Sequence, residues 1–65
     1  MREVTLYNKK LKETRILTER EDGFTEIELI NKKGVGSKSI GFKAIEQMVE
    51  YYKGKGYEVD FDTVQ

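Results

Sequence analysis

The 65-residue chain contains no cysteine, histidine, proline or tryptophan. Without cysteine it can form no disulfide and offers no thiolate ligand to a metal. Without histidine it lacks the commonest transition-metal ligand and the usual general base near neutral pH. So short a chain also has little room for a deep substrate pocket. We therefore predict a protein that is not an enzyme and has no metal site and no cofactor.

Long apolar runs are missing as well. No segment approaches the roughly 20 apolar residues that span a bilayer. The first ten residues, MREVTLYNKK, alternate charged and apolar side chains and do not resemble the apolar core of a secretory signal. The absence of cysteine suits a reducing compartment. We expect one domain, residues 1–65, located in the cytoplasm and without membrane contact.

The charges cancel overall but come in blocks of one sign. Twelve basic residues balance twelve acidic ones. Residues 1–15 sum to +3, residues 16–31 to −4, residues 32–43 to +4 and residues 58–65 to −3. Net neutrality argues against a protein that coats nucleic acid by bulk charge. Blocks of one sign can still become charged patches on a folded surface.

Alternating apolar and polar residues predict four strands, over residues 2–7, 11–19, 24–30 and 57–62. In the last of these, the apolar residues Tyr57, Val59 and Phe61 are expected to face inward. Glycines and polar residues at 31–39 predict a loop, and Ser37 or Ser39 is a suitable N-cap for a helix. The helix is predicted from about residue 40 to 53. Its apolar stripe comprises Phe42, Ile45, Val49 and Tyr52.

Turn lengths determine which strand residues share a face. Asp-Gly at 22–23 is a strong signal for a two-residue hairpin turn, which pairs Thr18 with Ile27. A three-residue turn at 8–10 gives a matching orientation to the first strand. The resulting core face holds Val4, Leu6, Ile16, Ile27 and Leu29. We predict an α+β fold with the order β-β-β-α-β: a mostly antiparallel sheet, one helix packed on one face, and the last strand beside the first.

The basic segment 32–43 is the first candidate site. Glycines let backbone N–H groups approach an anion, lysines add charge, and the N-terminus of a helix favours phosphate. The segment lacks the contiguous Gly-Lys-Ser/Thr of a nucleotide-binding P-loop. A flexible basic connection with a serine cap is the structural alternative. As a functional site, the loop and helix N-terminus would contact nucleic-acid phosphates through Lys32, Lys33, Gly36, Ser37, Lys38, Ser39 and Lys43.

The sheet face away from the helix is the second candidate site. One helix leaves that face uncovered, and clustered apolar residues there would indicate a contact surface. The predicted interface comprises Tyr7, Leu11, Leu17, Phe24 and Ile30. A second copy of the chain is the simplest partner, and a homodimer would support so small a core.

Two functions follow from these surfaces. The first is a small accessory or regulatory protein that binds DNA or RNA phosphates through the 32–43 segment. The alternative is a protein-interaction module, an inhibitor or adaptor, that uses the apolar outer face of the sheet. Net neutrality favours the alternative, and the concentrated positive charge at 32–43 favours the first.

Overall fold

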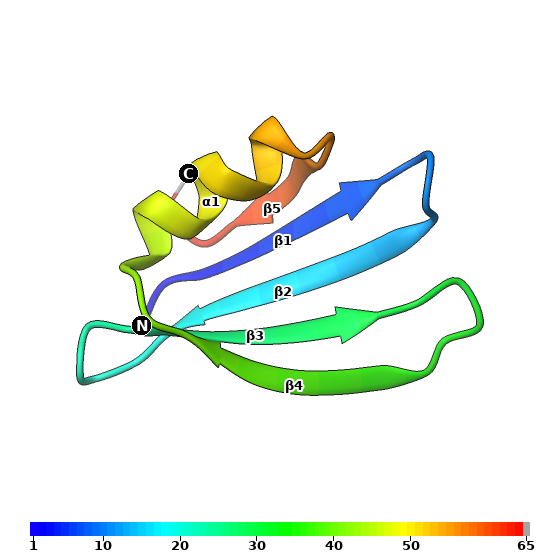
Figure 1. Ribbon diagram of the computed structural model, residues 1–65. Coiled ribbons are helices and arrows are strands. Elements are labelled where there is room, and N and C mark those ends of the chain that lie inside the picture. The colour runs from blue at the N-terminus through cyan, green and yellow to red at the C-terminus, as the bar shows by residue number, and fades with distance from the viewer. Residues whose placement is uncertain (65) are drawn as a thin grey trace.

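The computed structural model describes residues 1–64 and shows a five-stranded antiparallel sheet with one helix (Figure 1). The order across the sheet is β4-β3-β2-β1-β5. The elements are β1 (Glu3–Asn8), β2 (Glu13–Glu19), β3 (Thr25–Ile30), β4 (Gly36–Gly41), α1 (Ile45–Gly54) and β5 (Glu58–Asp62). The predicted α+β class is confirmed, and the last strand lies beside β1 as expected.

Residues 36–41 differ from the prediction, because they form strand β4 and not part of a loop and helix start. Each residue of β4 pairs with β3 in an uninterrupted antiparallel register. Strand β4 lies at the edge of the sheet, and most of its residues are exposed. Its sequence, GSKSIG, therefore needs no alternation of apolar and polar side chains and has none. Hydrophobic periodicity therefore gives no strand signal there.

The turn between β2 and β3 is one residue longer than the Asp-Gly signal predicts. Arg20 N–H donates to the carbonyl of Phe24 at 2.9 Å, which leaves a three-residue loop, 21–23. Gly23 closes this loop with φ of +89°, as in a type I turn followed by a left-handed residue. Leu17 consequently pairs with Ile27, where the prediction placed Thr18.

The turn between β1 and β2 is also longer than predicted, with four residues, 9–12. Lys12 N–H donates to the carbonyl of Asn8 at 2.7 Å, and Lys12 itself has a left-handed φ of 56°. Val4 therefore pairs with Leu17 and not with Thr14.

These two register differences reverse the faces of β2 alone. Val4, Leu6 and Ile27 lie on the core face as predicted. The register shift between β1 and β2 reverses the face of β2, and the shift between β2 and β3 reverses it back, so β1 and β3 keep their predicted faces. Leu17 replaces Ile16 on that face and is fully buried. A one-residue slip moves every side chain of a strand to the opposite face. The buried apolar core comprises Val4, Leu6, Leu17, Ile27, Ile45, Met48, Val49, Tyr52 and Tyr57.

The helix begins at Ile45, five residues later than predicted, and Ala44 is its N-cap. Its buried side chains, Ile45, Met48, Val49 and Tyr52, face the sheet. Phe42, predicted in the helical stripe, precedes the helix and is 78% exposed. Gly41 lets the end of β4 lie close against the core, because a Cβ there would be 2.9 Å from Ile27 Cδ1 and 3.3 Å from the Met48 side chain. No helix within residues 1–64 is long and apolar enough to cross a bilayer.

A β-bulge in β5 reverses its alternation. Thr5 pairs with Phe61 and Leu6 with Val59, so Asp60 has no partner in β1. Phe61, predicted inward, is 58% exposed, while Asp62, predicted to face water, is 7% exposed. Two hydrogen bonds from the Arg2 guanidinium, of 3.2 and 2.7 Å, compensate the burial of this carboxylate.

Leu17→Ala tests the observed register through stability. Truncating this fully buried side chain should lower the free energy of unfolding by about 2–5 kcal/mol, because it leaves a cavity beneath α1. Ile16→Ala, on the other face of the same strand, should cost less than about 2 kcal/mol. Urea unfolding followed by circular dichroism measures both. A larger loss for Ile16→Ala would contradict the register.

The Arg2–Asp62 pair predicts a loss of stability in acid. The Arg2 hydrogen bonds hold the pKa of Asp62 below its ordinary value of 3.8, with help from the Val64 N–H. A carboxyl with a lowered folded pKa stabilises the fold above its unfolded pKa, and that contribution is lost as the pH falls through the folded pKa. Unfolding measured between pH 6 and pH 2 should show this loss. Asp62→Asn should be less stable than the original chain at pH 6, and its stability should fall less on acidification. Equal falls would show that Asp62 contributes nothing.

Candidate anion-binding surface

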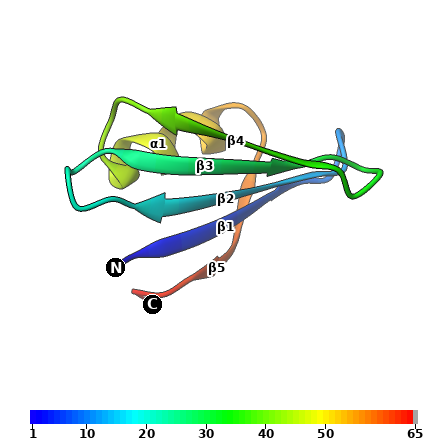
Figure 2. The same ribbon diagram turned by 90° about the horizontal axis from the view of Figure 1, so that it is seen from below.

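Three turns lie at the same end of the molecule. Figures 1 and 2 show the β1–β2 and β3–β4 turns together, far from the N-terminus and the β2–β3 turn. The turn between α1 and β5 joins them, because the Asn8 side-chain amide donates to the Lys55 carbonyl at 3.4 Å. Segments 9–12 and 53–57 are thus linked, and segment 31–35 lies at the same end of the sheet.

Asn8 organises the first of these turns. Its side-chain oxygen accepts from the backbone N–H groups of Lys10 and Leu11, both at 3.0 Å. Asn8 is 3% exposed, so its side chain is shielded from water while it makes these partly buried bonds. Asn8 therefore fixes the β1–β2 turn and, through Lys55, links it to the end of the helix.

Asn31 has a similar role in the β3–β4 turn. Its side-chain oxygen accepts from the N–H groups of Lys33 and Val35, at 2.9 and 3.0 Å. Gly34, with φ of +82°, closes a three-residue loop that matches the β2–β3 turn in type. The loop presents Lys32 and Lys33 to solvent.

We call the assembled surface the lysine-rich end. It carries seven exposed lysines: Lys9, Lys10, Lys12, Lys32, Lys33, Lys53 and Lys55. Among segments 8–13, 30–36 and 53–58, only Glu13 and Glu58 oppose them, which gives a net charge of +5. Lys9 Nζ lies 3.7 Å from Glu58 Oε1, and Lys53 Nζ lies 3.6 Å from Glu50 Oε2. The other five lysines make no ion pair within residues 1–64.

The opposite end of the molecule is acidic. There, seven carboxylates stand against Arg2, Arg20 and Lys43, a net charge of −4. The carboxylates belong to Glu3, Glu19, Glu21, Asp22, Glu26, Glu46 and Asp62. Arg20 binds Asp22, and this bond lowers the pKa of the Asp22 carboxyl. The neutral chain is therefore electrically polarised from one end to the other.

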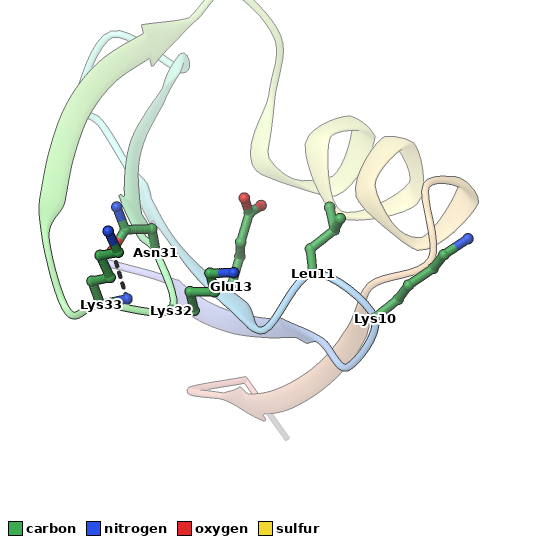
Figure 3. A pocket seen from close by; sticks show the side chains of 6 residues that line it. All are labelled: Lys10, Leu11, Glu13, Asn31, Lys32 and Lys33. Carbon is green, nitrogen blue, oxygen red and sulfur yellow. Dashed lines mark hydrogen bonds between the residues drawn. The ribbon is translucent and has the colours of Figure 1, made fainter.

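A hollow of about 380 Å³ opens between the β1–β2 and β3–β4 turns (Figure 3). Lys32, Lys33 and Asn31 lie on one side of it and Leu11 on the other, with Glu13 between them. The Glu13 carboxylate accepts from the Tyr57 hydroxyl at 2.7 Å. The ammonium groups of Lys32 and Lys33 at the rim attract an oxyanion, whereas the N–H groups of Lys33 and Val35 are already bonded to Asn31.

Tyr57, Arg15 and Glu13 form a fixed cluster beside this hollow. Arg15 Nε donates to the Tyr57 hydroxyl at 3.1 Å, and its guanidinium lies 4.6 Å from the Tyr52 ring centre. Burial and the hydrogen bond to Glu13 raise the pKa of Tyr57 above 10.0. Arg15 is thus occupied between the sheet and the helix, so the exposed positive charge comes from the lysines.

The structure separates the residues of the predicted phosphate site. Lys32 and Lys33 belong to the lysine-rich end. Lys38 lies on the outer face of β4, 4.0 Å from Glu26, and Lys43 lies at the acidic end beside the start of α1. The remaining predicted residues, Gly36, Ser37 and Ser39, lie in β4, and neither serine caps the helix.

The predicted outer interface is also changed. Tyr7 and Ile30 share the outer face through Thr14, which pairs with both. Leu17 belongs to the core instead. Leu11 lies in the β1–β2 turn, 51% exposed, and Phe24 lies in the β2–β3 turn, where it packs on Phe42. A protein contact through the outer face stays a prediction.

The sequence reasoning missed the lysines outside segment 32–43 as members of one site. Their signal was the +3 block at 1–15, which the prediction noted but did not join to Lys32 and Lys33. An antiparallel meander places alternate turns at the same end of a sheet, so the first and third turns could have been combined. Comparisons with known protein families, curated proteins and solved structures find no match to this chain.

Asn8→Ala tests how the site is held together. Removing this buried side chain leaves the N–H groups of Lys10 and Leu11 without their acceptor. The free energy of unfolding should fall by about 1–3 kcal/mol, and amide exchange at Lys10 and Leu11 should accelerate. Asn31→Ala is the matched control, because it removes two similar bonds at an exposed position and should cost less. Equal costs would show that burial of Asn8 is not what matters.

Proposed function

We propose that this chain is a small non-enzymatic accessory protein that binds the phosphate backbone of nucleic acid through its lysine-rich end. The observation that supports the proposal is the convergence of seven lysines from three separate turns, only two of which make ion pairs with any of residues 1–64. Free ammonium groups on one surface attract a polyanion and release its counterions on binding.

The electrical polarity of the molecule supports the same proposal. A net charge of +5 at one end and −4 at the other orients the chain in the field of a polyanion, so that the basic end leads. The acidic end would be repelled from the same backbone. Contact is therefore restricted to one end, which explains how a neutral protein can bind phosphate without coating it.

The proposed contact positions the protein without reading sequence. Lysines act as point charges toward phosphate. The arginine of the site, Arg15, is not free for bidentate contacts to bases, since it bonds Tyr57 and stacks on Tyr52. Asn31 and Asn8 use their side-chain oxygens to hold turns. Binding should therefore depend on backbone charge and tolerate changes of base sequence.

A salt titration with single charge reversals tests the proposal. Fluorescence anisotropy with a labelled DNA duplex and an RNA of equal length should show log affinity falling with log salt at a slope of roughly −3 or steeper. Lys10→Glu and Lys33→Glu should each weaken binding and make the slope shallower by about 1.

Lys43→Glu is the matched control, because it makes the same charge change at the acidic end. It should leave affinity and slope close to those of the original chain. Binding that is absent at low salt would overturn the proposal. So would an equal loss in all three variants, since this would show that net charge and not the lysine-rich end governs binding.

A further inference from the structure

Strand β4 leaves one edge of the sheet open. Among the described residues, 1–64, it pairs only with β3, and its register there runs without interruption from Gly36 to Gly41. Asn31 N–H donates to the Val35 carbonyl at 3.0 Å, so the alternation of an antiparallel ladder directs the N–H and C=O groups of Gly36, Lys38 and Ile40 away from β3. These groups form a row of free donors and acceptors, ready to pair with another strand.

The other edge of the sheet, β5, is protected against such pairing. Its bulge at Asp60 interrupts the ladder, and the exposed carboxylates of Glu58 and Asp60 would repel a second copy of the same edge. Strand β4 has no bulge, no proline and a single charged residue, Lys38. The two edges therefore differ, and only β4 has the features of an edge that pairs.

Exposed apolar side chains gather beside β4. Ile40 is 45% exposed, Phe24 is 39% exposed and Phe42 is 78% exposed. The rings of Phe24 and Phe42 contact each other edge-to-face with centres 5.6 Å apart. Ile40 and Phe42 line the same surface hollow as Lys38, which places the aromatic ring next to the free edge. An apolar group at an open strand edge is typical of a docking surface.

We propose that two copies of this chain associate by antiparallel pairing of their β4 edges, with Ser39 on the twofold axis. In this register Lys38 and Ile40 of the two copies form hydrogen-bonded pairs, as their outward backbone groups require. Gly36 comes opposite Phe42, so that the exposed ring covers a residue without a side chain. A shift of one pair would place Lys38 opposite Lys38, and like charges directly opposite each other are destabilising.

Charge complementarity selects a second copy as the occupant of this edge. Antiparallel pairing sets the two polarised molecules in opposite directions, so the β3–β4 turn of one copy, with Lys32 and Lys33, lies at the same end of the joined sheet as the acidic end of the other, which keeps a net charge of −4 with Lys43 included. The interface is isologous, so each contact occurs twice. Joining the sheets also gives additional support to a core that is small for an independent domain.

Opposite charges introduced at position 40 test both the dimer and its register. Sedimentation velocity over a range of concentrations should show the original chain changing from monomer to dimer. Ile40→Lys should weaken the dimer by roughly tenfold or more, because it sets Lys opposite Lys38 twice in one interface. Ile40→Glu should leave the dimer about as stable as that of the original chain, since Glu lies opposite Lys38 of the other copy.

The same substitutions have the opposite effect on the stability of the monomer, because Ile40 pairs with Glu26 of β3 within the single chain. Lys at position 40 should help the monomer fold and Glu should hinder it, so loss of folding cannot imitate the expected result. Monomers throughout the concentration range would overturn the proposal. So would a dimer weakened more by Ile40→Glu than by Ile40→Lys.

Lys38→Pro provides an independent check of edge pairing. Proline removes an N–H that points away from β3, so the β3–β4 ladder retains its bonds while the free edge loses a donor. The variant should fold and remain monomeric. Ser39→Pro removes an N–H that points toward β3 and should destabilise the fold itself. A dimer that survives Lys38→Pro would contradict pairing through β4, and unchanged nucleic-acid binding by that monomer would leave the proposed function intact.

Discussion

The register of β2 against its two neighbours determines which side chains the helix covers. Both turns that flank β2 close through residues with left-handed backbone, Lys12 and Gly23. Each turn is longer than the shortest possible hairpin, and each therefore shifts the pairing. The result places Leu17 beneath α1 and Arg15 beside Tyr52 and Tyr57. Two short turns thus decide the composition of the core, since strand side chains alternate between faces.

The same meander converts charge blocks in the sequence into charged ends of the molecule. Successive strands run in opposite directions, so the first and third turns lie at one end and the second turn lies at the other. Basic residues occupy the first and third turns, and acidic residues occupy the second. The helix then returns the chain to the basic end, where Lys53 and Lys55 are added. The polarity is therefore a consequence of topology acting on a neutral composition.

The sequence was sufficient to predict the features that repeat along a strand or helix. The strands β1, β3 and β5 and the buried side of the helix at Ile45, Val49 and Tyr52 follow from apolar periodicity. The position of β5 beside β1 was predicted from the path of the returning chain and is confirmed. Periodicity could not detect β4, because an exposed edge strand needs no apolar face. It could not orient β2 either, since Ile16 and Leu17 are equally apolar neighbours. Lys32 and Lys33 of the predicted site remain together, whereas Lys43 is carried to the other end by the unexpected strand.

An antiparallel β4 dimer and a phosphate-binding lysine-rich end are compatible in one assembly. The proposed pairing at β4 would bring Lys32 and Lys33 near the partner copy, because they lie next to that edge, while Lys9, Lys10 and Lys12 lie two strands away in the β1–β2 turn. The two lysine-rich ends then point in opposite directions along a shared sheet, so one straight segment of backbone cannot contact both. Each copy would bind its own segment, and a dimer would link two strands or two distant sites. Electrostatic pairing between copies would also weaken with salt, so both associations depend on the same ionic conditions.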